Sequence, residues 1–118
     1  MAATGEPRGW LQPPLAGFLH VLSPHHGISR GSDTSDDALR YLEEVIQLEG
    51  PQSIAAIIME SVVGTNGILI PPDGYYQGLR ALCDKYGILL IADEVMTGFG
   101  RTGEWFAVAH WNVVPDII

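Results

Sequence analysis

Two short, wholly apolar runs stand out in the second half of the chain. Residues 54–59 read IAAIIM, and residues 88–92 read ILLIA. Runs this short and dense are typical of strands buried on both faces, as in a parallel sheet covered by helices. Each run leads directly into acids, Glu60 after the first and Asp93 and Glu94 after the second. The pattern predicts two buried strands with carboxylates at their carboxyl ends.

A helical pattern precedes each of these runs. The first helix is expected over residues 35–50, with Ser35 as its N-cap and Gly50 at its end. Its apolar stripe consists of Leu39, Leu42, Val45 and Ile46. The second helix is expected to start at Asp73, as its cap, and to stop at Gly87. Its apolar side consists of Tyr76, Leu79, Leu82, Cys83 and Tyr86.

Strand, helix and strand within about forty residues predict a βαβ unit, in which the crossover makes the two strands parallel. Parallel strands share a carboxyl edge, so Glu60 and Asp93 are expected to lie on one rim. Residues 104–111 are expected to form a short helical turn, and residues 113–118 to begin a further strand. The fold class is therefore α/β.

The segment before the first helix has a different character. Residues 1–34 are rich in proline and glycine and lack a periodic pattern, which predicts loop. The residues expected to attach this segment to the core are Phe18, Leu19, Val21 and Leu22. His25 and His26 are adjacent and have no companion at metal-ligand spacing, so they are interpreted as loop residues and no metal site is expected.

Composition limits the partners and the compartment. Six basic against fourteen acidic residues give a net charge of −8, which opposes binding to nucleic acid or to an anionic membrane. The single cysteine, Cys83, excludes an intramolecular disulfide and a cysteine-based zinc site. The apolar runs are too short to span a membrane, and residues 1–20 contain no secretory apolar region. A cytoplasmic protein is expected.

The acids after the second strand admit several uses. Residues 98–103, GFGRTG, match G-x-G-x-x-G, but four residues separate this segment from Asp93, and a dinucleotide site needs the glycines directly after the strand. A strand ending in acids also resembles the magnesium strand of nucleotide hydrolases. Their phosphate loop requires a Gly-Lys pair, and the only lysine is Lys85 in DKYG. A nucleotide-hydrolase fragment and an acidic domain that binds a cation or a partner at the Glu60/Asp93 rim remain alternatives.

A third use is to hold a protonated ring nitrogen. Pyridoxal phosphate needs a carboxylate against its pyridinium so that the ring can take up electrons, and a nearby negative charge favours the protonated nitrogen. Asp93 is the candidate, and Val95 would lie on the same side if the strand continued. The alternative role for Asp93 is a cap on the following loop.

A long stretch of the chain resembles one enzyme family. Residues 60–103, ESVVGTNGILIPPDGYYQGLRALCDKYGILLIADEVMTGFGRTG, and residues 105–118, WFAVAHWNVVPDII, are similar to class III (omega-amino acid) pyridoxal-phosphate aminotransferases of fold type I. The resemblance implies an enzyme that moves an amino group from an amine or omega-amino acid to an oxo acid such as pyruvate, with pyridoxal 5'-phosphate as cofactor and a homodimer as the assembly. Residues 35–118 would be a partial large domain, incomplete at both ends, a parallel-sheet sandwich built of βαβ units.

The resemblance also assigns roles to residues. Asp93 matches the partner of the pyridinium, Val95 matches the residue packed on the ring, and Glu60 matches the acid of a Glu-Pro pair that helps to arrange the site. Ser61 replaces the proline of that pair, which is expected to loosen the turn, and Met96 replaces a glutamine found in some members. The family's Schiff-base lysine follows a Pro-Asp-Ile-Ile stretch, whereas here residues 115–118 are the last. The 118 residues alone are therefore expected to be inactive.

Overall fold

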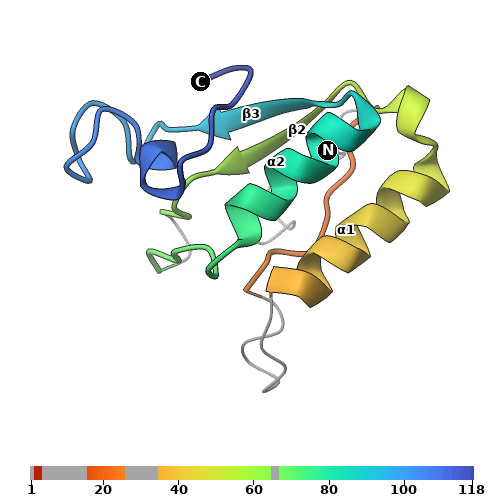
Figure 1. Cartoon of the computed structure of the whole chain (residues 1–118), viewed down its shortest axis with the longest axis horizontal. Coiled ribbons are helices and arrows are strands. Elements are labelled where there is room, and N and C mark those ends of the chain that lie inside the picture. The colour runs from red at the N-terminus through yellow and green to blue at the C-terminus, as the bar shows by residue number, and fades with distance from the viewer. Residues whose placement is uncertain (1, 4–15, 26–34, 65–66) are drawn as a thin grey trace.

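The computed structural model describes residues 2–3, 16–25, 35–64 and 67–118. The elements in chain order are β1 (Ala2–Ala3), α1 (Ser35–Glu49), η3 (Pro51–Ser53), β2 (Ala56–Glu60), α2 (Tyr75–Tyr86), β3 (Leu89–Asp93) and η4 (Ala107–Trp111). The three strands form one sheet in the order β1-β2-β3, with both pairings parallel. The two helices lie together over the sheet (Figure 1).

The predicted βαβ unit is present. Strands β2 and β3 flank α2 in sequence, and their register pairs Ala56 with Leu89 and Glu60 with Asp93. The two acids therefore end neighbouring strands at the same edge, as the sequence predicts. Beyond β3, Ile117 forms a parallel bridge with Ile91, and its carbonyl accepts the Ala92 N–H at 2.9 Å. The strand expected to begin within residues 113–118 is thus paired where Ile117 meets β3.

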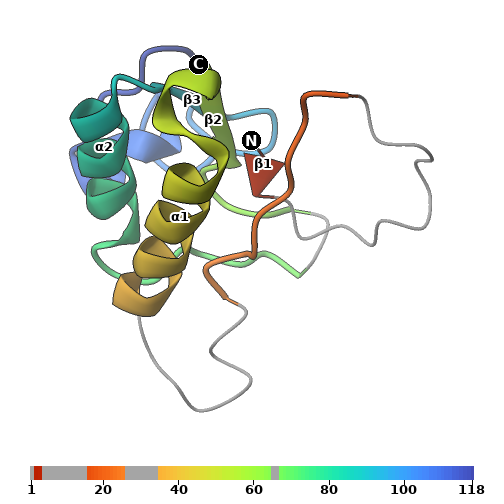
Figure 2. The ribbon, with the colours of Figure 1, turned by 90° about the vertical axis from the view of Figure 1, so that its right-hand side faces the viewer.

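The core lies between the helices and one face of the sheet. Alternate residues of the strands are buried there, and they pack in one cluster with the apolar stripes of α1 and α2. This cluster includes Leu42, Ile46, Ile57, Met59, Tyr76, Leu79, Cys83, Leu90 and Ala92. Burying a side chain of this size contributes about 1.5–3 kcal/mol to folding, so these contacts fix the position of the strand ends. Figure 2 shows the helices on one side of β2 and β3.

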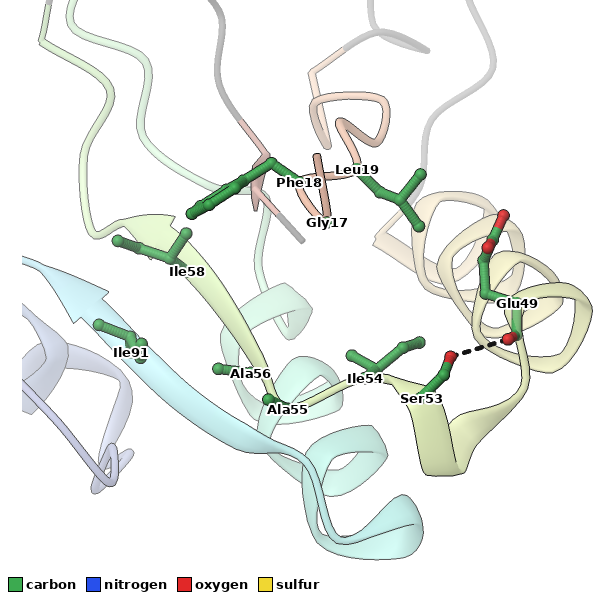
Figure 3. A pocket seen from close by; sticks show the side chains of 10 residues that line it. All are labelled: Gly17, Phe18, Leu19, Glu49, Ser53, Ile54, Ala55, Ala56, Ile58 and Ile91. Atoms are coloured by element: carbon green, nitrogen blue, oxygen red, sulfur yellow. Dashed lines mark hydrogen bonds between the residues drawn. The ribbon is translucent and has the colours of Figure 1, made fainter. Parts of the chain in front are cut away.

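The opposite face of the sheet carries the other alternate residues. Ala56, Ile58 and Ile91 line a pocket of about 700 Å³ there, together with Phe18 and Leu19 of the N-terminal segment. Figure 3 shows Phe18 and Leu19 on one side of this pocket and the strand residues Ala56, Ile58 and Ile91 on the other. Ile58 and Ile91 come two residues before Glu60 and Asp93, so the two acids lie on this same face, beyond the pocket.

The ends of α2 show one wrong prediction and one confirmed prediction. Asp73 does not cap the helix: the N-cap is Gly74, at φ 79°, and no side chain caps the end. The left-handed backbone conformation of the N-cap residue favours glycine, which explains why Gly74 takes the cap and Asp73 precedes it. At the other end, Gly87 adopts the left-handed conformation at φ 67° and stops the helix, as expected.

The terminal segments differ from expectation in three places. Ala2–Ala3 pairs with β2 as a short strand inside the segment that the sequence predicts as loop. Of the four residues expected to attach this segment, Val21 is buried, whereas Phe18, Leu19 and Leu22 are exposed. The helical turn expected over 104–111 is a shorter 3-10 helix, η4.

The structure also bears on the adjacent histidines, on metal binding and on membrane-spanning helices. His26 lies outside the described residues, and the His25 Nε2 donates to the Ile70 carbonyl at 2.6 Å. Among residues 2–3, 16–25, 35–64 and 67–118, no group of three or more metal-ligating side chains is found. No helix in the same part of the chain is long and apolar enough to cross a membrane.

Candidate functional site

The paired acids at the carboxyl edge are held by short local contacts. Glu60 accepts the Gly64 N–H through Oε2 at 3.1 Å, and Asp93 accepts the Val95 N–H through Oδ1 at 3.0 Å. The capping role considered for Asp93 is therefore real, but it uses one oxygen. Within the described residues, Oδ2 has no hydrogen-bond donor, and no cation pairs with Asp93. Asp93 Oδ2 is therefore available to accept a hydrogen bond from a ligand.

An apolar surface lies beside this carboxylate. Strand β3 ends at Asp93, so the alternation expected to bring Val95 to the same side does not continue, and Val95 instead begins a turn. Its side chain is 90% exposed. The next residue, Met96, packs on the loop after β2, where a Cβ added to Gly64 would stand 2.8 Å from Met96 Cγ. The unused Asp93 oxygen can accept a hydrogen bond from a protonated ring nitrogen, and the exposed Val95 side chain offers an apolar surface two residues further along the chain.

Glu94, which the sequence does not single out, is the most heavily contacted of these acids. It is 7% exposed, and its carboxylate accepts hydrogen bonds from Ser61, Thr97, Ala107 and Val108. Burial by itself raises the pKa of Glu94, but the hydrogen bonds from Ser61, Thr97 and the two backbone N–H groups outweigh it and hold the pKa below its usual range. Glu94 is a buried carboxylate, and its charge is fully satisfied by donors.

Ser61 is held tightly despite the prediction that it would loosen the turn. Its N–H donates to the Asp93 carbonyl at 3.2 Å, and its hydroxyl donates to Glu94 Oε1 at 2.6 Å. The side chain is fully buried. A proline at this position has neither an N–H nor a hydroxyl, so the main-chain contact requires a residue other than proline and the side-chain contact requires a hydroxyl.

The glycine-rich segment after Asp93 forms turns. Residues 98–103 open no helix, so the dinucleotide interpretation is excluded by geometry. Gly98 is needed for close approach, because an added Cβ would stand 2.9 Å from the Glu94 carbonyl oxygen. Phe99 packs edge-on against Trp105 and Phe106 yet stays largely exposed. Arg101 is exposed and has no place in the site described here.

Lys85 lies away from the candidate site. It is in the last turn of α2, and Figure 1 shows that end of the helix near the start of β3. Because β3 then runs from Leu89 to Asp93, Lys85 lies at the end of the strand opposite Asp93. Its Nζ pairs with Glu43 of α1 at 2.7 Å, and this bond raises the pKa of Lys85. The interpretation of Lys85 as a surface residue is confirmed.

The sequence profile of the family described as Aminotransferase class-III matches residues 1–118. This chain belongs to the class III aminotransferase family. The nucleotide-hydrolase alternative is thereby excluded, and so is an unrelated acidic domain. Class III aminotransferases are enzymes that use pyridoxal 5'-phosphate.

Individual relatives agree with the family. The omega-aminotransferase of Caulobacter vibrioides is 51% identical over 115 residues, which cover 88% of this chain and 25% of the relative. The taurine–pyruvate aminotransferase of Bilophila wadsworthia is 53% identical over 79 residues, covering 67% of this chain and 17% of the relative. The chain thus spans about a quarter or less of the length of these curated relatives.

Solved structures share the fold. The taurine:2-oxoglutarate aminotransferase of Bifidobacterium kashiwanohense, in complex with PLP and glutamate, has a TM-score of 0.80 and 50% sequence identity. The match covers 86% of this chain and 24% of that one. The omega-transaminase of Thermomicrobium roseum has a TM-score of 0.81 and 42% identity, over 92% of this chain and 25% of that one. The α/β fold is therefore part of the large domain of a fold type I enzyme.

Proposed function

We propose that this chain forms part of the cofactor site of an aminotransferase that moves an amino group from an amine or omega-amino acid to an oxo acid such as pyruvate. The observation that carries the proposal is the pair of Asp93 and Val95: a carboxylate with one unused oxygen beside an exposed apolar side chain, at the carboxyl edge of a parallel sheet. Open α/β sheets bind their ligands at that edge. The family match supports the chemistry.

Three residues have distinct tasks in this proposal. When bound, pyridoxal phosphate supplies a ring that takes up the electron pair released as a substrate C–H bond breaks. Asp93 holds a proton on the ring nitrogen through its negative charge, Val95 packs on the ring and excludes water from it, and Glu60 orders the loop after β2 through the Gly64 N–H. Residues 1–34 would precede the partial large domain formed by residues 35–118.

The assembly and surroundings are proposed on the same basis. We expect a homodimer that acts in the cytoplasm on small amino donors and oxo acids, without nucleic-acid or membrane partners. The net charge of −8 supports the expectation of no nucleic-acid or membrane partner, since an acidic protein is repelled by nucleic acids and by anionic membranes. We also propose that the 118 residues alone do not transaminate, because their only lysine, Lys85, lies at the edge opposite Asp93.

A chimeric enzyme tests the role of Asp93. Residues 35–118 would replace the matching segment of the Caulobacter vibrioides omega-aminotransferase, and alanine formation from pyruvate would be measured with β-alanine and with taurine as donors. We expect an active chimera in which Asp93→Asn lowers kcat/KM on the order of 100-fold, because a neutral amide no longer holds the proton on the ring. The circular dichroism spectrum should not change.

The matched control is Asp73→Asn, an exposed aspartate outside α2. It should leave kcat/KM within twofold of the unsubstituted chimera. An Asp93→Asn chimera with full activity would contradict the assignment of Asp93 as the pyridinium partner.

A further inference from the structure

Glu94 links three segments that are distant in sequence. Its Oε1 accepts the Ser61 hydroxyl at 2.6 Å and the Val108 N–H at 2.9 Å. Its Oε2 accepts the Ala107 N–H at 3.0 Å and the hydroxyl of Thr97. One buried carboxylate thus connects the residue after β2, the turn after β3 and the first residues of η4. Hydrogen bonds to an ionised group are the stronger kind, so this junction is rigid.

The bonds of Glu94 lie on the side of β3 that faces away from the Asp93 side chain. Leu90 and Ala92 of β3 are buried toward the helices, whereas Asp93 lies on the opposite face of the strand. Glu94 reaches the helix side through Ser61, whose hydroxyl donates to Glu94 and lies 3.4 Å from the Tyr76 hydroxyl of α2. The main chain around Asp93 is also held. Its carbonyl accepts the Ser61 N–H at 3.2 Å, and the Glu94 carbonyl accepts the Thr97 and Gly98 N–H groups at 3.1 and 2.7 Å.

We infer that Glu94 is a positioning residue for the cofactor site. Its buried carboxylate fixes the turn at residues 94–98, and this turn sets where the Asp93 carboxylate stands. The N–H that orients Asp93 Oδ1 belongs to Val95, inside the same turn. Glu94 therefore acts through Asp93 and touches no ligand itself. This inference rests on the proposed function, since it concerns the same site.

Ser61 takes part in this arrangement in a way that a proline at the same position could not. The resemblance identifies the position as the proline of a Glu-Pro pair, and proline offers no donor to Glu94 or to the Asp93 carbonyl. Here both donors are present, at 2.6 and 3.2 Å. Ser61 joins the ends of β2 and β3 through side chain and main chain together. Removing its hydroxyl should weaken the positioning of Asp93 less than altering Glu94 does.

The first test uses the whole 118-residue protein. Amide hydrogen exchange would be compared between the unsubstituted chain, Glu94→Gln, Ser61→Ala and the control Glu104→Gln, which alters an exposed acid in the same region. We expect Glu94→Gln to speed exchange of the Val95, Thr97 and Gly98 amides about tenfold or more, because the amide group presents an N–H to donors. Ser61→Ala should have a smaller effect in the same direction. Unchanged exchange in both variants would overturn the inference.

The second test asks whether Glu94 acts through Asp93. In the chimeric enzyme, the dissociation constant of pyridoxal phosphate and the pH dependence of its visible absorbance would be measured for Glu94→Gln, Asp93→Asn and the double variant. We expect about tenfold weaker binding for Glu94→Gln and a shifted absorbance titration, which a purely structural effect would not produce. The double variant should bind no more weakly than Asp93→Asn alone.

The outcomes separate the two proposals. Additive losses in the double variant would show that Glu94 acts independently of Asp93 and would overturn the inference while the proposed function stands. If Asp93→Asn leaves both binding and absorbance unchanged, the proposed role of Asp93 fails instead. If Glu94→Gln does not fold, Ser61→Ala, which removes one of the four bonds, takes its place in the same comparison, and an additive loss there has the same meaning.

Discussion

The neighbouring acids Asp93 and Glu94 show how much a single residue depends on its surroundings. Strand alternation predicts that they point to opposite faces, but it does not tell which one is left with an unused oxygen. Sequence reasoning selected Asp93, from its place at the strand end. Glu94 is not selected, because three of its four partners are distant in sequence: a serine 33 residues earlier and two backbone N–H groups 13 and 14 residues later, with only the Thr97 hydroxyl nearby. Backbone donors carry no sequence signal.

The pH dependence of stability tests the state of Glu94. The folded-state pKa of Glu94 lies below its ordinary value of 4.5. The carboxylate therefore stabilises the fold above pH 4.5, and this contribution is lost as the pH falls through the lowered folded-state pKa. Tyr76, whose hydroxyl lies 3.4 Å from the Ser61 hydroxyl and whose pKa is raised chiefly by burial, stays neutral over this range. Stability that depends on Glu94 should therefore be present at pH 7 and absent in acid.

We expect Glu94→Gln to lower the free energy of unfolding by about 1–3 kcal/mol at pH 7, since a buried donor is left unpaired. The difference from the unsubstituted chain should shrink at pH 3. Urea unfolding followed by circular dichroism measures both values. Glu104→Gln should stay within about 0.5 kcal/mol at either pH. A loss that is equally large at pH 3 and pH 7 would mean that the ionised carboxylate is not what stabilises the junction.

At the scale of elements, hydrophobic periodicity was sufficient for the main helices and strands. The helices expected at 35–50 and 73–87 are α1 and α2. The apolar runs at 54–59 and 88–92, each extended by the acid that follows it, contain β2 and β3. The errors fall where periodicity carries no information. Ala2–Ala3 is a two-residue strand that owes its pairing to the neighbouring β2, and Gly74 takes the cap because of its left-handed backbone. The shared rim of Glu60 and Asp93 was predictable, because parallel topology alone determines it.

Arg80 connects α2 to the residues that pair beyond β3. Its guanidinium bonds Asp84 on the same helix at 2.8 Å and Asp116 at 2.7 Å. Asp116 also accepts the Leu90 N–H at 2.7 Å, and this bond, with Arg80, holds the pKa of Asp116 below its usual range. The side chain of Arg80 is largely buried, so its removal should weaken the local contacts between α2 and Asp116.

We expect Arg80→Met to loosen the pairing of Ile117 with β3 while the helix stays intact. The Ala92 N–H, which donates to the Ile117 carbonyl, should exchange about tenfold faster. Amide hydrogen exchange measures this, with the amides of α2 as an internal reference. Arg40→Met is the matched control, because Arg40 pairs on the surface of α1 with Asp37 three residues earlier. Equal acceleration at Ala92 in both variants would show that Arg80 has no special role there.

At the scale of the whole molecule, the two edges of the sheet differ in chemistry. The carboxyl edge has Asp93 and Glu60, while the opposite edge has the only lysine, paired with Glu43 and packed near Tyr86. The four residue steps from Leu89 to Asp93 along β3 span about 13 Å at about 3.3 Å per residue. Under the proposed function, an amine that joins the cofactor must reach the edge of Asp93. Lys85 cannot do so without unfolding α2.

This separation predicts how the 118-residue protein reacts with pyridoxal phosphate. We expect no alanine formation from pyruvate and β-alanine, and covalent attachment only at exposed amines, detected by mass spectrometry after borohydride reduction. Attachment to Lys85 should be the same in the unsubstituted chain and in Asp93→Asn, because the two residues act at different edges. Lys85→Arg, which keeps a cation beside Glu43, should abolish attachment at that position. Attachment at Lys85 that depends on Asp93 would show that the two edges meet, and the assignment of the site to the carboxyl edge alone would be wrong.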